Sequence, residues 1–355
     1  MIKLPFHINK MADLPPTFVP GFHDESEVRK MRYNKFGDTG LKVSHLSVGT
    51  GGFCLQYGDY TIELCKAMLH QAIKSGINYI DTAPWYGHGV AEEVLGKCLE
   101  GIPRQAYYIA TKVGRYEADP KSMFDFSTEK TTWSIDTSLK KLGIDYIDII
   151  QVHDIEFAPS LDIVLNETLP TLEEALIAGK AKYIGVTGYP VKCLYQCIKK
   201  SRVKIDTVLS YCRLSLLDNT FNQYRPYFQT RNLGIINAAA NCMGLLTNGG
   251  PQPWHPASKE IKDVCKEARE YCKSKGVELA KLAVYYSFQR PGPHTHLVGM
   301  NNCDLLKANM DVLHNGLTDL EKDVLEHLQK KIFINLERGN WEGVELEKRR
   351  KILSQ

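Results

Sequence analysis

The sequence lacks the features that mark disulfide scaffolds, metal proteins and membrane proteins. Its ten cysteines contain no Cys-x-x-Cys pair, and the closest two are Cys193 and Cys197. Because disulfide frameworks belong to short secreted chains and metal sites need tighter clusters, we expect reduced cysteines and no bound metal. No apolar run approaches the roughly 18 residues of a spanning helix. The longest weakly polar stretch, 234–246, is interrupted by Asn237 and Asn241.

An excess of one charge is also missing. The 44 Lys and Arg residues nearly balance 41 Asp and Glu residues, which leaves a formal net charge of +3 with the signs interspersed. Nucleic-acid and anionic-membrane partners are normally met by a basic field, so we expect neither. Residues 1–16 have neither the apolar core nor the cleavage site of a secretory signal. We therefore expect a cytoplasmic protein, monomeric or homodimeric.

What the sequence does have is a regular alternation of two patterns. Short β-branched or apolar runs alternate with amphipathic stretches, whose apolar residues recur every three or four positions. The short runs predict strands at 46–49, 79–81, 107–112, 146–153, 183–187, 207–211, 234–237 and 296–299. Eight strand–helix repeats within one length of chain predict an α/β protein whose parallel sheet closes into a barrel.

The sequence also divides into three regions. Residues 1–31 are proline-rich without periodicity, which predicts an N-terminal extension, and 32–335 would form the barrel. Two short alternating runs around the Gly-Asp-Thr-Gly segment at 37–40 predict a β-hairpin. Residues 336–355 form a charged tail, and we expect its basic run at 348–351 to be solvated.

Charged and polar side chains close three consecutive predicted strands. Asp81 ends the second strand, Lys112 ends the third, and His153 with Asp154 ends the fourth. The carboxyl ends of barrel strands meet at one mouth, where the chemistry of such barrels takes place. Each residue alone could be a solvated strand end. Because three at one level favour a site, and because unpaired buried charges are costly, we expect Asp81 and Lys112 to pair.

Tyr86 follows Asp81 by five residues and completes an acid–base set. A free phenol, with a pKa of about 10, exchanges protons poorly at neutral pH. A nearby ammonium lowers this pKa, and Lys112 could supply it with Asp81 as its anchor. His153 could hydrogen-bond a substrate oxygen. Since none of these groups carries hydride, carbonyl–alcohol interconversion here would need a nicotinamide cofactor.

At these positions the segments NYIDTAPWYG, IATKVGR and IIQVHD resemble the aldo-keto reductase superfamily, over about residues 32–330. The segments GVTGYP, LSYCR, GLLT and PWHPAS are similar to its L-galactose 1-dehydrogenase-like branch. The resemblance implies a single (β/α)8 TIM barrel with an N-terminal hairpin capping its bottom. It also implies a catalytic tetrad of Asp81, Tyr86, Lys112 and His153. Tyr86 would be the general acid when NAD(P)H reduces an aldehyde, ketone or sugar lactone, and the same groups would oxidise alcohols.

The resemblance further implies cofactor contacts in the loops that follow the strands. By position they are Gly51, Gly52, Phe53, Asp81, Thr187, Gly188, Ser210, Ala239, Asn241, Met243, Gly244, Gly299, Met300, Asn301, Leu305 and Asn309. The four from Ala239 to Gly244 would approach the pyrophosphate, and the five from Gly299 onwards would lie at the adenosine end. Many relatives carry a cation that holds the 2′-phosphate of NADP, whereas the matching positions here are neutral and Lys307 is the nearest cation. A phosphate dianion needs charge-assisted donors, so NAD is favoured over NADP.

Aromatic and histidine side chains in the mouth loops are candidates for the substrate wall. Trp85, His88 and Trp254 would join Tyr86 and His153 around a small carbonyl, alcohol or sugar, although simple loop packing explains each of the three equally well. An alternative function is also open. Some barrels of this superfamily serve as regulatory or binding subunits with little turnover, and an intact tetrad does not exclude that role.

Overall fold

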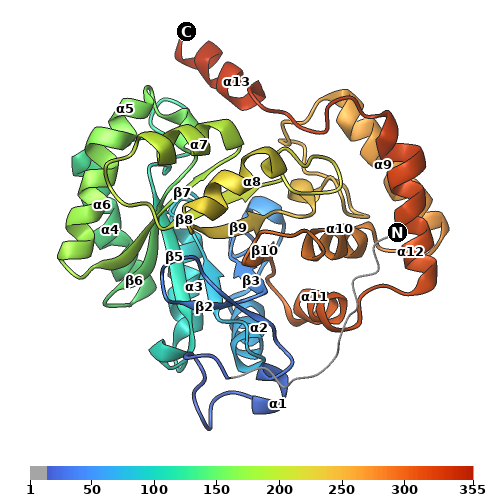
Figure 1. Cartoon of the computed structure of the whole chain (residues 1–355), viewed down its shortest axis with the longest axis horizontal. Helices are drawn as coiled ribbons and strands as arrows, with labels where there is room; N and C mark the ends of the chain where they lie inside the picture. Colours follow the sequence, from blue (N-terminus) through green and yellow to red (C-terminus); the bar gives the residue numbers. More distant parts are fainter. Residues whose placement is uncertain (1–13, 355) are drawn as a thin grey trace.

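The computed structural model describes residues 14–354 and confirms the predicted barrel (Figure 1). Eight parallel strands close in the order β10-β3-β4-β5-β6-β7-β8-β9. The strands are β3 (Leu46–Gly49), β4 (Tyr79–Asp81), β5 (Tyr108–Val113), β6 (Ile147–Val152), β7 (Ala181–Gly188), β8 (Thr207–Tyr211), β9 (Gly234–Ala238) and β10 (Thr295–Gly299). Each lies within two residues of its predicted position, because the apolar runs that identify the strands also form the buried sheet.

The predicted strand ends need two corrections at the mouth. Lys112 is the last residue but one of β5, and His153 lies just beyond β6. The backbone N–H of His153 still donates to the carbonyl oxygen of Val113 (2.8 Å). Asp154 then adopts a left-handed backbone conformation with φ of 50°. This turn ends the ladder and directs the chain out of the barrel.

Helices cover the outside of the barrel and begin and end at recognisable residues. Thr61 caps the first long helix by accepting a hydrogen bond from the N–H of Leu64 (3.2 Å), and Gly143 ends the helix after β5 with φ of 64°. The helices are α1 (Glu25–Val28), α2 (Ile62–Lys74), α3 (Val90–Leu99), α4 (Thr128–Leu142), α5 (Leu161–Ile163), α6 (Leu169–Ile177), α7 (Val191–Lys200), α8 (Phe221–Thr230), α9 (Lys259–Ser274), α10 (Leu279–Phe288), α11 (Cys303–Asn315), α12 (Asp319–His327) and α13 (Val344–Leu353).

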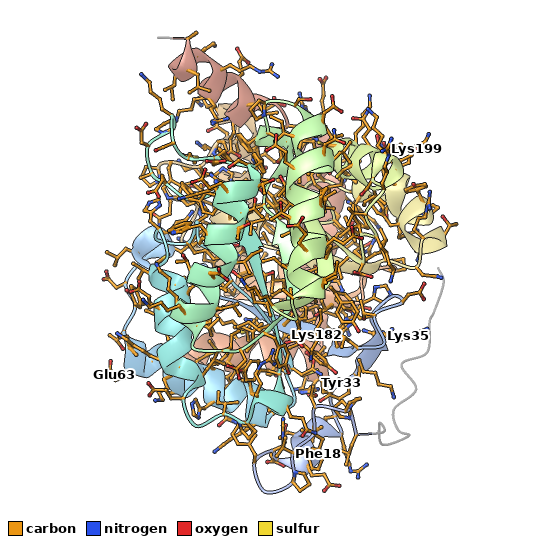
Figure 2. All side chains as sticks on the ribbon, turned by 90° about the vertical axis from the view of Figure 1, so that its left-hand side faces the viewer. Phe18, Tyr33, Lys35, Glu63, Lys182 and Lys199 are labelled. Atoms are coloured by element: carbon orange, nitrogen blue, oxygen red, sulfur yellow. The ribbon has the colours of Figure 1, made fainter. Side chains whose placement is uncertain are left out.

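The predicted hairpin forms one end of the molecule. Strands β1 (Tyr33–Lys35) and β2 (Lys42–Ser44) pair antiparallel, and Phe36 between them is fully buried among inward-facing residues of the barrel. Gly37 has φ of 55°, and a Cβ atom there would collide with the carbonyl oxygen of Asn232. In Figure 2, Tyr33 and Lys35 lie at the end away from the red helix α13. The hairpin therefore leaves the opposite end, the mouth, to other segments.

The expectation of a fully solvated basic run in the tail is wrong for Arg349 on α13. Its Nε donates to the carbonyl oxygen of Pro120 (3.3 Å) and its Nη1 to that of Phe157 (3.2 Å). Its guanidinium carbon also lies 4.7 Å from the ring centre of Phe124. A guanidinium can stack on an aromatic face while donating to carbonyls, which a charge count does not reveal. The tail thus packs on the barrel.

Within residues 14–354, no three His, Cys, Asp or Glu side chains converge as a metal would require. In the same range, no helix is long and apolar enough to cross a membrane. All ten cysteines are free thiols, and most are buried. Burial raises the pKa of thiols such as Cys98 to about 12, so they remain protonated at neutral pH.

Candidate active site

The four residues predicted to be catalytic converge at the mouth of the barrel. Lys112 Nζ lies 2.5 Å from Asp81 Oδ1 and donates to the carbonyl oxygen of Thr82 (2.7 Å). It also lies 3.4 Å from the Tyr86 hydroxyl oxygen. The rings of Tyr86 and His153 meet edge to face, with 6.0 Å between centres. Asp81 and Lys112 are 0% and 1% exposed, so their opposite charges are paired away from water.

Gln151 belongs to this cluster and was missed from the sequence. Its Nε2 donates to the second carboxylate oxygen of Asp81 (2.8 Å), and the residue is fully buried. Gln151 lies on β6 two residues before His153, so both project to the same face of the strand. The signal was present, because Gln151 is a polar residue between the apolar residues Ile150 and Val152. Asp81 therefore has a partner on each oxygen and holds Lys112 in one position.

Burial changes the expected acid–base properties of Tyr86. We predicted that Lys112 would lower the pKa of the phenol. Burial is the larger effect and raises the pKa of Tyr86 above its ordinary value, although Lys112 opposes this. Burial is also the largest single effect on Lys112 and lowers its pKa, but the charges of Asp81 and Tyr86, together with the hydrogen bonds to both, raise the pKa above its ordinary value. At neutral pH the pair is therefore a protonated phenol beside a charged ammonium.

His153 is neutral and has an unused ring nitrogen. Burial, followed by the charges of Lys112 and Arg115, holds the pKa of His153 well below its ordinary value. Its Nδ1 is buried without a hydrogen-bond partner among residues 14–354, and its Nε2 lies 3.7 Å from an Asp154 oxygen. A neutral imidazole beside a phenol can hydrogen-bond a small oxygen-containing ligand.

Two of the predicted substrate residues form one side of the mouth. The Trp85 and His88 rings meet edge to face at 5.2 Å, and His88 Nδ1 lies 2.8 Å from the carbonyl oxygen of Tyr116. Arg115, which sequence reasoning missed, places its guanidinium carbon 4.0 Å from the Trp85 ring centre. Arg115 Nη1 is 2.6 Å from an Asp154 oxygen. A stacked arginine therefore connects the aromatic wall to the residue that follows His153.

Trp254, the third aromatic or histidine residue predicted to contact the substrate, comes from the loop after β9. It is 43% exposed and packs edge to face against Tyr57, with 5.6 Å between ring centres. Tyr57 is itself 42% exposed, so this aromatic pair lies at the surface of the molecule. His255, the next residue, is buried and lies 3.1 Å from the carbonyl oxygen of Cys242, which fixes this loop to the barrel.

With this geometry established, comparison with known proteins is decisive. The Aldo/keto reductase family model matches residues 45–330. This chain belongs to that family. It is 40% identical to L-galactose dehydrogenase of Arabidopsis thaliana over 82% of this chain and 90% of the relative. It is 31% identical to D-arabinose 1-dehydrogenase of Saccharomyces cerevisiae over 82% and 91%.

Solved structures agree with this assignment. A holo-form aldo-keto reductase of Bacillus halodurans superposes with a TM-score of 0.67 at 26% identity, covering 84% of this chain and 97% of the other. The protein is therefore an oxidoreductase that acts on carbonyl or CH–OH groups, and aldo-keto reductases take NADH or NADPH as their cofactor.

The loop after β9 has a strained backbone of the kind found at ligand sites. Ala239, Cys242 and Met243 have positive φ values of 55°, 50° and 53°, and Gly244 has 99°. Left-handed conformations in residues other than glycine cost energy and cluster at ligand sites. Three of these residues use their N–H groups within the chain: Ala239 donates to Leu297 (3.3 Å), Cys242 to Ala239 (2.8 Å) and Gly244 to Asn241 (3.2 Å). Ala239, Met243 and Gly244, predicted to approach the pyrophosphate, all share this conformation.

Other predicted cofactor residues differ in how they could contribute. Ser210, at the mouth end of β8, has a buried hydroxyl without a hydrogen-bond partner in the described chain. The Thr187 hydroxyl accepts from the N–H of Asp154 (3.2 Å). Phe53 is fully buried in the core, so only its backbone could face a ligand. The unpaired Ser210 hydroxyl and the left-handed loop fit a nicotinamide dinucleotide.

The predicted adenosine end forms a separate group around β10. Asn301 Nδ2 donates to the carbonyl oxygen of Gly52 (3.3 Å), which links the loops after β10 and β3. Asn309 is buried on α11, and its Nδ2 donates to the carbonyl oxygen of Leu305 (2.8 Å). Leu305 is 44% exposed. The remaining predicted residues, which lie beside these or near the mouth, are Gly51, Gly188, Asn241, Gly299 and Met300.

Proposed function

We propose that this aldo-keto reductase is an aldose 1-dehydrogenase in which Tyr86 transfers the proton. The supporting observation is the short distance between the Tyr86 hydroxyl and Lys112 Nζ (3.4 Å), with Asp81 holding Lys112 from the other side. The names of three relatives support a sugar substrate: L-galactose dehydrogenase, D-arabinose 1-dehydrogenase and a D-threo-aldose 1-dehydrogenase of Pseudomonas that is 26% identical.

Each residue of the tetrad would have its own role in the reaction. A bound nicotinamide ring supplies the acceptor or donor of hydride. In oxidation, Tyr86 accepts the proton of the C1 hydroxyl as hydride leaves C1, and in reduction Tyr86 returns a proton to the carbonyl oxygen. The Lys112 charge stabilises the phenolate form of Tyr86. His153, which is neutral, orients the substrate oxygen. Because the pKa of Tyr86 is raised, oxidation should accelerate and reduction should slow as the pH rises towards it.

The test is turnover of aldoses with each cofactor. The purified protein is mixed with L-galactose, D-arabinose or another aldose and with NAD⁺ or NADP⁺, and reduced nicotinamide is followed by absorbance. Turnover of at least one aldose is the expected result. Turnover of simple carbonyl compounds without any aldose would contradict the sugar substrate. Cofactor binding without any turnover would favour the regulatory alternative.

We also propose that NAD is preferred, and this carries its own prediction. Leu305 is exposed at the predicted adenosine end, so Leu305→Arg should supply a charge-assisted donor to the 2′-phosphate of NADPH. The ratio of NADH to NADPH dissociation constants should shift towards NADPH by roughly tenfold or more. Fluorescence titration measures both constants. The control is Leu320→Arg, which adds the same charge at an exposed position on α12. An equal shift in both variants, or none in either, would place the adenosine elsewhere.

A further inference from the structure

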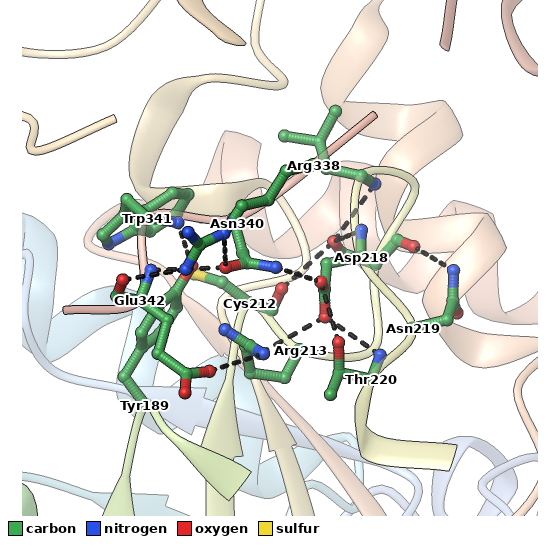
Figure 3. A network of polar contacts seen from close by, with 12 residues as sticks. Tyr189, Cys212, Arg213, Asp218, Asn219, Thr220, Arg338, Asn340, Trp341 and Glu342 are labelled. Atoms are coloured by element: carbon green, nitrogen blue, oxygen red, sulfur yellow. Dashed lines mark hydrogen bonds and ion pairs between the residues drawn. The ribbon is translucent and has the colours of Figure 1, made fainter. Parts of the chain in front are cut away.

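The tail crosses the mouth of the barrel and is anchored first by an aromatic residue. Trp341 is 2% exposed and stacks on Tyr189 at the end of β7, with 4.9 Å between ring centres. Its backbone N–H donates to the Tyr189 hydroxyl (3.0 Å), and the His255 ring packs edge to face on it at 4.8 Å. Figure 3 shows the contact with Tyr189. The tail is thus fixed to the loops that follow β7 and β9.

A buried ion-pair network forms the second anchor (Figure 3). Arg213, in the loop after β8, lies with Nη2 2.8 Å from a Glu342 oxygen and with Nε 3.2 Å from an Asp218 oxygen. Asn340 Nδ2 donates to the other Asp218 oxygen (2.7 Å). The Arg213 side chain is 2% exposed. Loss of Glu342 would leave a buried charge partly unpaired, so this junction holds the tail in one place.

Arg349 is the third anchor, because it binds the loops after β5 and β6 as described above. The segment between Trp341 and Arg349 therefore spans the mouth from one side to the other. Residues four apart on a helix lie on the same face, so Glu345 faces the barrel as Arg349 does. Glu347 instead lies on the outer face and pairs with Lys351 (2.8 Å) in solvent.

Glu345 lies on the side of α13 that faces Arg115. Arg115 and Arg349 lie against the same Phe124 ring, with guanidinium carbons 5.1 Å and 4.7 Å from its centre, so the face of α13 that carries Arg349 lies beside Arg115. Burial raises the pKa of Glu345, and the charges of Arg115 and Asp154 lower and raise it, respectively. Glu345 makes no ion pair or side-chain hydrogen bond with residues 14–354. Asp154 Oδ1, in a residue that is 2% exposed, also has no partner in that range. Arg115 joins these acids to Trp85. Two carboxylates, an arginine and an indole therefore lie at the mouth beside the residue that follows His153.

We propose that Glu345 and Arg115 bind the hydroxyl groups of the aldose remote from C1, and so select a polyhydroxylated substrate over an apolar carbonyl compound. This inference rests on the proposed function. A carboxylate accepts hydrogen bonds from neighbouring hydroxyls, and a guanidinium donates to hydroxyl or ring oxygens. Sites built to hydrogen-bond a substrate hydroxyl discriminate strongly against analogues that lack it.

The test separates sugar recognition from chemistry. Glu345→Leu should raise the KM for the aldose by about 10- to 100-fold, because a hydrogen bond to a charged group is lost. Its KM for reduction of propanal, which has no hydroxyl groups, should stay within twofold of the wild-type value. Glu345→Gln keeps part of the hydrogen bonding, so its KM for the aldose should lie between the values of wild type and Glu345→Leu. The matched control, Glu347→Leu on the outer face of the same helix, should behave as wild type with both substrates.

The possible results discriminate between the two proposals. If wild type oxidises the aldose but Glu345→Leu leaves its KM unchanged, the assignment of Glu345 is overturned and the proposed function stands. If Glu345→Leu raised the KM for the aldose and for propanal equally, the substitution would be disturbing the tetrad, and the assignment of Glu345 would also be overturned. If wild type reduces propanal but oxidises no aldose, the proposed function itself fails. Equal cofactor dissociation constants in all variants would show that the fold is intact.

Discussion

Tyr86→Phe lowers turnover by about 10²- to 10⁴-fold, the scale of general acid–base catalysis. The substitution removes only the hydroxyl beside Lys112 Nζ and leaves the ring packed against His153. The cofactor dissociation constant should therefore remain nearly unchanged. Steady-state kinetics with a simple aldehyde and with an aldose, together with fluorescence titration of the cofactor, would measure both quantities.

A matched control for this substitution is Tyr107→Phe. Tyr107 is also buried, but it packs beside Arg104, whose guanidinium carbon lies 4.8 Å from its ring centre, away from the tetrad. Tyr107→Phe should therefore have the same turnover as wild type. Full activity in Tyr86→Phe would show that another group transfers the proton, and equal losses in both variants would point to a general effect of hydroxyl removal on the core.

Lys112→Met should lower the free energy of unfolding by about 3–5 kcal/mol, because it leaves the fully buried Asp81 carboxylate without its cation. The Gln151 amide would remain as its partner but carries no charge. Urea unfolding followed by fluorescence measures the change. The double variant Asp81→Asn/Lys112→Met should recover part of this loss, since it removes the stranded charge as well.

The Lys180–Asp136 pair provides the comparison. Lys180 Nζ lies 2.6 Å from Asp136 Oδ1, a distance similar to that in the buried pair, but the two side chains are 38% and 54% exposed. Lys180→Met should therefore cost only about 0–1 kcal/mol. If Lys112→Met were no more destabilising than Lys180→Met, water would have to reach Asp81 freely, and the description of a dry, paired charge at this position would be wrong.

Residues on regular strands were the easiest to predict. Asp81, Lys112 and His153 stand out because polar groups end apolar runs, and parallel strands bring those ends to one mouth. The pairing of Asp81 with Lys112 followed from the cost of an unpaired buried charge. Gln151 could have been found by the same reasoning. The shift in the pKa of Tyr86 could not, because its sign depends on how deeply the surrounding loops bury the phenol.

The roles of residues outside the strands were harder to predict, for a physical reason. Arg115, Arg213 and Glu345 acquire their roles from contacts between segments far apart in the chain, and local periodicity contains no information about such contacts. The side chain of Phe53 is fully buried, so the contact with the cofactor that the family resemblance implies would have to come from its backbone, and it stays a prediction. The division of the chain at 31/32 and 335/336 remains a prediction.

The position of the tail has a consequence for the order in which the molecule is completed. A ribosome finishes the last barrel strand at Gly299, whereas the segment that spans the mouth begins after residue 340. All eight strands can therefore be in the nascent chain before Trp341 emerges to cover their carboxyl ends. Because chains fold in the order of their synthesis where they can, the barrel has an open mouth until the segment from Trp341 onwards has been synthesised. A transcript cut short before Trp341 would encode every strand but lack both the cover and Glu345.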